Sequence, residues 1–554
     1  MEAVESNGRH GDAGADGRRT PKKDRRNMWA SAFILVNNFL QYSAYFGVST
    51  NLVNYLKYRL NEGSKSAANN VTNWQGTGSI TPLVAAYLAD AFLGRYWTIF
   101  IFMIISILGY GVLTASAAAA LQGAVFYAGL YLVALGGGLL VVLAPFGADQ
   151  FDEADEEERG RQSSFFNWFY LSLNFGSLVG GAMVWVQTSV GWGIGYGIPA
   201  IFSALSVAVF LAGTATYRRG QPPGGSPLTR IAQVVVAAAR KYDVEVPPDA
   251  SVLHERDADD GMSAIQGSRR LVHTAQFRFL DKAAVETAVD KAAPSPWRLC
   301  TVTQVEELKC VLRLLPVWAS GIIFSAAYTQ MTTTFILQGD TLDPRVGGFK
   351  VPAAVLSVFD TLSVMLWVPL YDRAIVPVAR RVTGHKRGFT QLARMGVGLV
   401  ILTVAMLTAG TLEVARRRVI ARHGLYDDGT GDDGRYLPLS IFWQVPQYVV
   451  VGASEVFTFI GQMEFFYDQA PDAMRSLCSG LSSTSFALGN YASSAIVVVV
   501  AQTTARGGRP GWIPDNINRG HLDDFFWLLA VLCIGNFAAY LLIARWYTYK
   551  KTVD

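Results

Sequence analysis

The first long apolar segment carries amide and phenol side chains at a spacing that suits solute binding. Asn38, Gln41 and Tyr42 follow one another at i, i+3 and i+4 within "NNFLQYSAYFGVSTNL". This spacing places the side chains on one face of a helix, and we expect that face to line a central cavity. Amides and phenols form hydrogen bonds but cannot release or take up a proton near neutral pH. The sequence therefore predicts a polar, uncharged wall at this position.

Carboxyl groups lie inside two later apolar segments, Asp360 in "SVFDTLSV" and Glu455 in "VGASEVFTF". A charge at mid-membrane costs at least about 2.5–3.5 kcal/mol and persists chiefly where function needs it. We therefore interpret Glu455 as a functional group, with a buried neutral acid as the alternative. For Asp360 a structural role and a functional role are equally open.

The segments that must position these residues are apolar enough to cross a membrane. The chain has 554 residues, of which 51% are hydrophobic and 16% charged, whereas soluble proteins carry roughly a quarter charged residues. Charged residues are absent from 29–56, 71–89, 96–148 and 162–217. A helix of about 20 such residues spans the hydrocarbon layer, and continuous rather than alternating apolar runs exclude a barrel. We predict an all-α membrane protein.

The predicted spans fall into two groups of six around a polar segment of the chain. They run at about 29–56, 72–92, 96–119, 121–147, 163–188, 193–217, 309–338, 352–381, 388–413, 437–466, 473–502 and 523–547. This is the layout of the major facilitator superfamily, with twelve transmembrane helices in two six-helix bundles. The predicted domains are a disordered cytosolic tail at 1–28, an N-terminal bundle at 29–217, a cytosolic linker at 218–307, a C-terminal bundle at 308–548 and a cytosolic tail at 549–554.

The basic loops support a cytosolic N terminus. "LGRYW", "ERGRQ", the central segment, "RRVTGHKRG" and the "YKK" tail would all lie inside, as the positive-inside rule requires. The basic stretch "RRRVIARHG" would lie outside, and we interpret it as an extension of the ninth helix.

Paired charges recur at the same junction of each half. "DAFLGRYWT" contains Asp90, Gly94 and Arg95, and "YDR" contains Asp372 and Arg373. Such pairs at helix ends can be simple interfacial anchors. Because the pattern is repeated in both halves, we interpret both as gating loops in which glycine allows a tight turn.

Several longer stretches carry a family resemblance. The stretches are "NVTNWQGTGSITPLVAAYLADAFLGRYWT", "FGADQFDE", "FFNWFYLSLNFGSL", "HTAQFRFLDKAA", "PWRLCTVTQVEELKCVLRLLPVWASGIIFSAAYTQM", "SVFDTLSVMLWVPLYDR" and "VPQYVVVGASEVFTFIGQMEFFY". They resemble the plant nitrate/peptide transporter family, the plant arm of the proton-coupled oligopeptide transporters, and most of all its di- and tripeptide branch. The resemblance extends from Trp29 to the last span.

The resemblance fails at the charges that the family uses for proton coupling. The family's first helix carries E-x-x-E-R, where this chain has Asn38, Gln41 and Tyr42. The family's fourth helix usually presents a lysine where this chain has Leu140. The usual proton relay therefore cannot run on the first helix. Either Glu455 alone carries the proton, or transport runs downhill.

The resemblance also implies roles for residues elsewhere. Glu455 matches the tenth-helix glutamate that meets the substrate's amino group, and Asn174 matches a fifth-helix asparagine that contacts peptide. Tyr328 stands where nitrate carriers of the family can have histidine. Tyr45 and Tyr328 suit a peptide cavity, and helix packing is the alternative for these aromatic residues and for Asn174. Thr98 in an R-x-x-T pattern is a candidate phosphorylation site.

A zwitterionic peptide needs a cation for its carboxylate and an anion for its amine, and this sequence keeps only the anion. We therefore expect a secondary transporter that moves di- and tripeptides or related amine-bearing solutes by alternating access, with proton coupling lost or altered. The alternatives are a carrier of nitrate or another small solute, and a membrane sensor that binds ligand without cycling.

The remaining expectations concern chemistry and partners. No span carries a nucleophile–base pair or a metal-ligand set, so we expect no enzyme activity and no cofactor. The expected partners are a small-molecule substrate, protons if coupling persists, and membrane lipid, with no nucleic acid. We expect a monomer in the plasma membrane or the vacuolar membrane.

Overall fold

The computed structural model describes residues 21–61, 64–119, 123–152, 155–218, 225–255, 263, 265, 268–293, 295–346, 349–351, 353–384, 388–427, 436–505, 511–514 and 516–552. Residues 1–20 of the predicted disordered tail at 1–28 lie outside the described residues. Helix α1 begins at Pro21, eight residues before the predicted start of the N-terminal bundle at residue 29. Proline suits the first turn of a helix, because its missing N–H would have no partner there.

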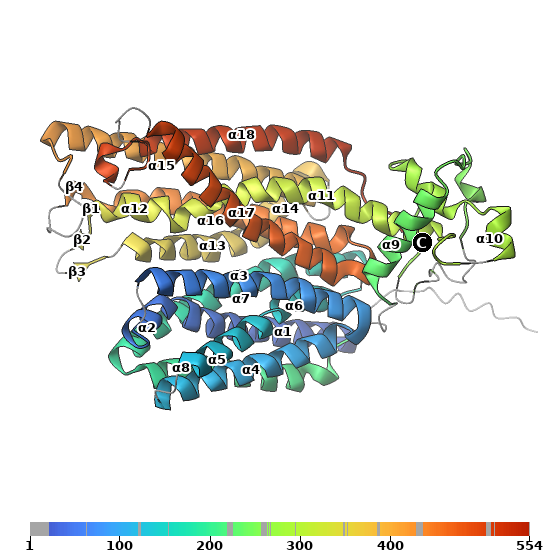
Figure 1. Ribbon diagram of the computed structural model, residues 1–554, viewed down its shortest axis with the longest axis horizontal. Coiled ribbons are helices and arrows are strands. Elements are labelled where there is room, and N and C mark those ends of the chain that lie inside the picture. The colour runs from blue at the N-terminus through green and yellow to red at the C-terminus, as the bar shows by residue number, and fades with distance from the viewer. Residues whose placement is uncertain are drawn as a thin grey trace, which may run out of the picture.

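The first half of the chain forms one bundle of helices, drawn in blue to teal in Figure 1. Its helices are α1 Pro21–Ser49, α2 Leu52–Tyr58, α3 Ser64–Leu88, α4 Arg95–Ala119, α5 Gly123–Gly136, α6 Leu139–Ala148, α7 Glu156–Ser189 and α8 Trp192–Ala212. Helix α1 packs on α7 and α8, and α4 packs on α5 and α8.

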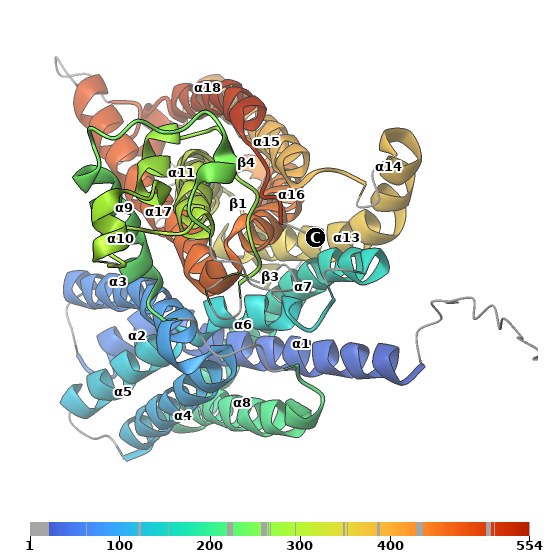
Figure 2. The same ribbon diagram turned by 90° about the vertical axis from the view of Figure 1, so that its right-hand side faces the viewer.

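The second half forms the other bundle, in yellow to red, and lies alongside the first in both views (Figures 1 and 2). Its helices are α11 Val302–Tyr328, α12 Thr334–Asp340, α13 Val358–Leu370, α14 Val376–Thr383, α15 Gln391–His423, α16 Val445–Gln469, α17 Arg475–Thr504 and α18 Leu522–Trp546. Two short strand pairs join loops at one end of this bundle: β1 Leu342–Asp343 with β4 Leu437–Ser440, and β2 Arg345–Val346 with β3 Phe349–Lys350. The bundles meet where α3 and α6 pack on α17, and where α7 packs on α13 and α16. We call this contact the seam.

Ten helices within the described ranges are long and apolar enough to cross a membrane. Each of the twelve predicted spans overlaps helices of the structure. The remaining two, α1 and α3, have the required length but carry more amide and hydroxyl side chains. Several of those polar groups donate hydrogen bonds inside the bundle, where lipid offers no partners. For example, Asn37 donates to the Ser206 carbonyl at 2.9 Å and Thr81 to the Ala134 carbonyl at 2.8 Å.

Helix α15 continues to His423, which confirms that the basic stretch before the tenth span extends the ninth helix. The helix remains regular there because its charges are paired. Arg416 and Glu413 are both fully buried and lie 2.6 Å apart, and Arg417 contacts Asp523 at 2.6 Å.

The central segment is folded and packs at one end of the molecule, beside the C terminus (Figure 1). Its helices are α9 Pro227–Arg240, the 3-10 helix η5 Arg278–Ala284 and α10 Ala288–Ala292. An apolar cluster that includes Val234, Ala237 and Leu280 joins α9 and η5 to the start of α11. Helix α11 begins at Val302, inside the predicted linker, and Thr301 caps it through a reciprocal pair with Gln304. We call this the central-segment end; the sequence predicts that it faces the cytosol.

Candidate substrate site and gate

The gating motif of the N-terminal bundle lies at a break in helical geometry. A π-helical turn, η1 Ala89–Leu93, ends at Gly94, whose φ is 74° and ψ 158°. Glycine alone adopts this backbone region without strain, so the chain can turn sharply from η1 into α4. Asp90 and Arg95 are thereby held on either side of the turn, with 3.8 Å between carboxylate and guanidinium.

Both motif charges reach across the seam. Arg95 donates from Nε to Ser476 Oγ at 2.8 Å, and Asp90 accepts the backbone N–H of Leu477 at 2.7 Å. Arg95 is also ion-paired with Asp149 at the end of α6. The motif therefore ties η1, α4 and α6 to the start of α17.

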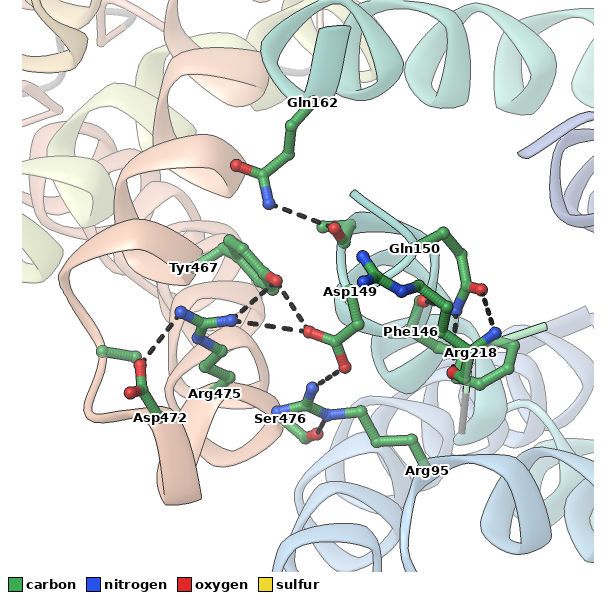
Figure 3. A network of polar contacts seen from close by, with 12 residues as sticks. Arg95, Phe146, Asp149, Gln150, Gln162, Arg218, Tyr467, Asp472, Arg475 and Ser476 are labelled. Atoms are coloured by element: carbon green, nitrogen blue, oxygen red, sulfur yellow. Dashed lines mark hydrogen bonds and ion pairs between the residues drawn. The ribbon is translucent and has the colours of Figure 1, made fainter. Parts of the chain in front are cut away.

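Asp149 is the centre of this network (Figure 3). Its Oδ1 accepts the Tyr467 hydroxyl at 2.7 Å and lies 3.5 Å from Arg475. Arg475 in turn pairs with Asp472 at 2.9 Å. Only 15–17% of the Arg95 and Asp149 side chains is exposed, so little water screens the pair. We call Arg95, Asp149, Tyr467 and Arg475 the gate network.

The second motif repeats this arrangement from the opposite bundle. It lies in another π-helical turn, η8 Tyr371–Ile375. Asp372 accepts hydrogen bonds from Ser164 at 2.7 Å and from Asn167 at 3.3 Å, both on α7. The Arg373 guanidinium lies 6.0 Å from the Trp168 ring centroid. Single π-turns inside helices occur often at functional sites, and here each one aims its charges at the other bundle.

The gate network lies at the central-segment end of the molecule. Two arginines of the central segment contact residues beside it. The backbone N–H of Arg218 donates to Gln150 at 2.7 Å, and Arg269 forms an ion pair with Asp472 at 3.0 Å. The seam is therefore closed by polar contacts at the end that the sequence predicts to be cytosolic.

Glu455 lies further along the seam and is bound by residues of both bundles. The Tyr170 hydroxyl on α7 donates to Oε1, and the Tyr328 hydroxyl on α11 donates to Oε2 at 3.2 Å. Phe459 and Phe486 pack on the Tyr328 ring, with centroids 5.3 and 6.0 Å away. The structure thus brings together Glu455 and Tyr328 of the predicted site, and adds Tyr170.

Asp360 lies beside Glu455. It projects from α13, is 4% exposed, and its carboxyl is a hydrogen-bond partner of the Glu455 carboxyl. The expectation of a lone acid is therefore wrong, and the two acids form a pair. A sequence pattern could not show this, because the two residues are distant along the chain.

The amides of the first helix point into the bundle. Asn38 is fully buried and donates to Ser172 Oγ at 2.8 Å, and Gln41 donates to Ser206 Oγ at 2.5 Å. In this conformation the neighbouring helices α7 and α8 cover both side chains, so their place in the cavity wall stays a prediction. Their hydrogen bonds stabilise helix packing.

The other predicted substrate residues lie apart from Glu455. Tyr42 is half-buried and packs on Phe46, and Tyr45 stacks on Trp74 of α3 at a centroid distance of 5.5 Å. Asn174 donates to the Tyr170 carbonyl of its own helix at 3.1 Å, one turn from the Glu455 contact. Its role as a peptide contact stays a prediction.

Thr98 is fully buried and donates to the Gly94 carbonyl at 2.9 Å. A kinase cannot reach this hydroxyl while the gate network is closed. Its phosphorylation therefore stays a prediction that requires an opened central-segment end.

A buried arginine that sequence reasoning did not single out lies near the acid pair. Arg394 on α15 is 2% exposed and donates to Asn167 Oδ1 at 2.8 Å and to the Val456 carbonyl at 3.0 Å. It lies 3.6 Å from Glu464 and 4.0 Å from the Tyr371 ring centroid. Among the described residues, the N-terminal bundle pairs no cation with Glu455, whereas Arg394 of the C-terminal bundle bonds to the carbonyl of Val456, the residue that follows Glu455. The sequence could have pointed to Arg394, because "FTQLARMGVG" places a charged residue inside a predicted span.

Clusters with metal-ligand chemistry lie at both ends of the molecule. His273, Asp281 and Glu306 lie close together, but Lys309 occupies that position, 2.6 Å from Asp281 and 2.9 Å from Glu306. In the second cluster, His521, Asp523 and Asp524, the Asp523 carboxylate is paired with Arg417. Protein cations thus already balance both clusters.

Comparison with known proteins gives consistent matches. The model of the POT family, PTR2, matches residues 96–513. Protein NRT1/PTR FAMILY 8.1 of Arabidopsis thaliana is 53% identical over 554 residues, which cover 96% of each chain. Among solved structures, the POT family transporter PepTSo has a TM-score of 0.61 at 22% identity, over 96% of this chain and 99% of that one. An auto-inhibited POT family peptide transporter has a TM-score of 0.56 at 23% identity, over 95% and 98%. At such identities the solved structures are similar in fold alone.

Proposed function

Because the chain belongs to the POT family of transporters, as a plant member of the nitrate/peptide type, we propose that it carries di- and tripeptides or related amine-bearing solutes by alternating access. It is an integral, multi-pass membrane protein with the major facilitator fold. The observation that carries the proposal is the position of Glu455. A buried carboxylate at the seam, bound by tyrosine hydroxyls from both bundles, offers an ammonium group an anion and two movable polar neighbours.

The gate network supports a protein that cycles rather than a sensor. At the central-segment end, these contacts between the bundles are made by side chains and by one backbone N–H group. Such contacts can break without unfolding either bundle. Two equivalent motifs, each in a π-turn, are an arrangement for switching between closed and open ends.

Substrate selectivity follows from the charges around Glu455. No ion pair within the described residues involves Glu455 or Asp360. A solute with an amine gains an anionic partner, whereas an anion such as nitrate would meet two carboxyl groups. We therefore propose an amine-bearing substrate over nitrate.

Proton coupling on the first helix is absent in this proposal. Asn38 and Gln41 are neutral and bonded to α7 and α8, so neither they nor the hydroxyls that they contact can titrate near neutral pH. Coupling is either lost or carried by another group.

Counterflow in proteoliposomes tests the proposal. Vesicles loaded with unlabelled dipeptide should accumulate labelled dipeptide from outside, since exchange requires cycling and no proton gradient. Binding of dipeptide without exchange would instead identify a sensor. Failure to bind or exchange dipeptide, with exchange of nitrate, would defeat the proposed substrate class.

A further inference from the structure

The hydrogen bond between Asp360 and Glu455 has no donor while both carboxyl groups are ionised. Both carboxyl groups are 4% exposed, and each is the other's partner. Two carboxylates have only acceptor oxygens, so a hydrogen bond between them requires that one carries a proton. Ionised carboxylates this close would also repel each other strongly in a site with little water.

The surrounding groups show that a proton is needed. Both Glu455 oxygens accept tyrosine hydroxyls, Tyr170 on one side and Tyr328 on the other. By contrast, Asp360 Oδ1 is buried and has no hydrogen-bond donor opposite it. A proton between the carboxyl groups supplies the missing donor.

The described helices that pack against Asp360 and Glu455 contribute neutral phenols, or a cation that is already bonded to other groups. Helix α7 contributes Tyr170, α11 contributes Tyr328 and α16 contributes Tyr448, all phenols. On α15, Arg394 bonds to the Val456 carbonyl and to Asn167, and lies 3.6 Å from Glu464. Within the part of the chain that the structure describes, no cation is paired with Asp360 or Glu455, so a proton is the positive charge that the pair can hold.

We propose that Asp360 and Glu455 share one proton and that this pair is the proton-coupling site of the transporter. The inference rests on the proposed function, because it assigns the energetics of the same substrate site. When an amine-bearing solute binds, its ammonium group pairs with the Glu455 carboxylate and the proton stays on Asp360. When the solute leaves toward the central-segment end, the O–H bond of Asp360 breaks and the proton passes to water. One proton then accompanies each solute.

This assignment explains how coupling can persist without charges on the first helix. The pair lies on α13 and α16 in the C-terminal bundle, while Tyr170 belongs to the N-terminal bundle. Movement of the bundles apart would remove the Tyr170 hydroxyl from Glu455 and admit water to the pair. Proton release is thereby linked to the conformational change that releases solute.

The test measures protons and solute together in proteoliposomes that contain an entrapped pH-sensitive dye. The wild-type chain should acidify the lumen as a neutral dipeptide enters, and Asp360→Asn should abolish acidification while counterflow of the dipeptide continues. The control is Asp340→Asn, which removes an exposed carboxyl at the end of α12 and should leave both readings unchanged.

The possible results separate the two proposals. Net uptake of dipeptide by the wild type without acidification overturns the proton-coupling site, and the proposed function still stands if counterflow is observed in a separate assay. Acidification that persists in Asp360→Asn also overturns it. Absence of wild-type counterflow overturns the proposed function itself. If Asp360→Asn does not fold, Asp360→Glu keeps a carboxyl group, and loss of acidification in that variant would contradict the assignment.

Discussion

Glu455 accepts hydrogen bonds from a tyrosine of each bundle, and in the proposed function its charge decides which substrates bind. Replacing Glu455 by Gln keeps the shape and removes the anion. Losing one partner of a buried charged pair commonly costs about 2–5 kcal/mol, which is roughly thirty-fold to several-thousand-fold in affinity. We predict that the dipeptide concentration needed for half-maximal inhibition of counterflow rises by at least roughly thirty-fold. An unchanged value would show that the ammonium group binds elsewhere.

Gly94 tests the gate at the level of a single residue. Its φ of 74° lies where a side chain is strained, at about 1–3 kcal/mol. We predict that Gly94→Ala lowers the melting temperature of the purified protein and weakens closure of the gate.

The matched control is Gly111→Ala on α4. An added Cβ there meets nothing within 4 Å, and alanine favours a helix over glycine by roughly 0.5–1 kcal/mol. The control variant should melt at the same temperature or slightly higher. Equal losses in both variants would refute the role of the Gly94 turn.

The sequence singles out residues whose type alone is informative. Charges and acids inside apolar segments are costly, so Glu455 and the paired motifs stood out. It could not show that α7 and α8 cover Asn38 and Gln41, because helical spacing shows which residues share a face but not which neighbour covers it. It also missed Asp149 and Tyr170, which act through partners that only the tertiary structure brings near.

The two π-turns, η1 and η8, are the elements that shape the gate. The turn η1 places Arg95 at the start of α4, where it bonds to Asp149 and Ser476. We predict that Arg95→Ala opens the central-segment end. In a Ser164→Cys reporter background, the thiol should react faster with a membrane-impermeant maleimide applied from that side. The native cysteines are all buried, so background labelling is low.

Arg161 supplies the control for this experiment. It pairs with Glu157 one turn away on the surface of α7, with 47% and 68% of the two side chains exposed. Such surface pairs contribute little. Arg161→Ala should therefore leave the labelling rate unchanged. Faster labelling in both variants would contradict a specific role for the gate network.

The central segment is a further element with its own ion pairs. Asp290 on α10 is fully buried at its side chain and lies 2.8 Å from Lys241 at the end of α9. Burial alone would raise the pKa of Asp290, but hydrogen bonds from Lys241 and Thr287 outweigh it and hold the pKa well below its usual value. A depressed pKa means that the pair stabilises the fold above the unfolded-state pKa, about 3.9, and that this stability is lost as pH falls below it.

Lys241→Met tests this pair. Removing a hydrogen bond to a charged group costs about 1.5–3 kcal/mol, and Arg298, 3.3 Å from Asp290, remains as a partner. We predict a lower melting temperature at pH 7 and a difference from wild type that narrows toward pH 3. A difference that is independent of pH would show that lost packing, rather than charge, explains the change.

At the scale of the whole molecule, composition and repeated layout were enough to predict the two bundles. The bundles pack along α3, α6 and α7 against α13, α16 and α17, and the central segment with the C-terminal residues covers one end (Figure 2). The folded state of the central segment could not be predicted, because its sequence is polar overall and its apolar cluster is assembled from short, distant pieces.

In the proposed function, Glu455 is the anion for the substrate's amine, and no cation among the described residues is assigned to the substrate's carboxylate. The nearest cation, Arg394, is bonded to Asn167 and the Val456 carbonyl. A blocked amine should therefore prevent transport, while a blocked carboxylate should be tolerated. This asymmetry is the central physical claim about the transporter.

The most direct measurement is counterflow of a labelled dipeptide in competition with two modified forms of the same dipeptide. We predict that the C-amidated form competes as well as the free acid and that the N-acetylated form does not compete. Equal competition by all three would remove Glu455 from recognition. Failure of the C-amidated form would show that a cation, with Arg394 as the nearest candidate, binds the substrate carboxylate and would contradict the account.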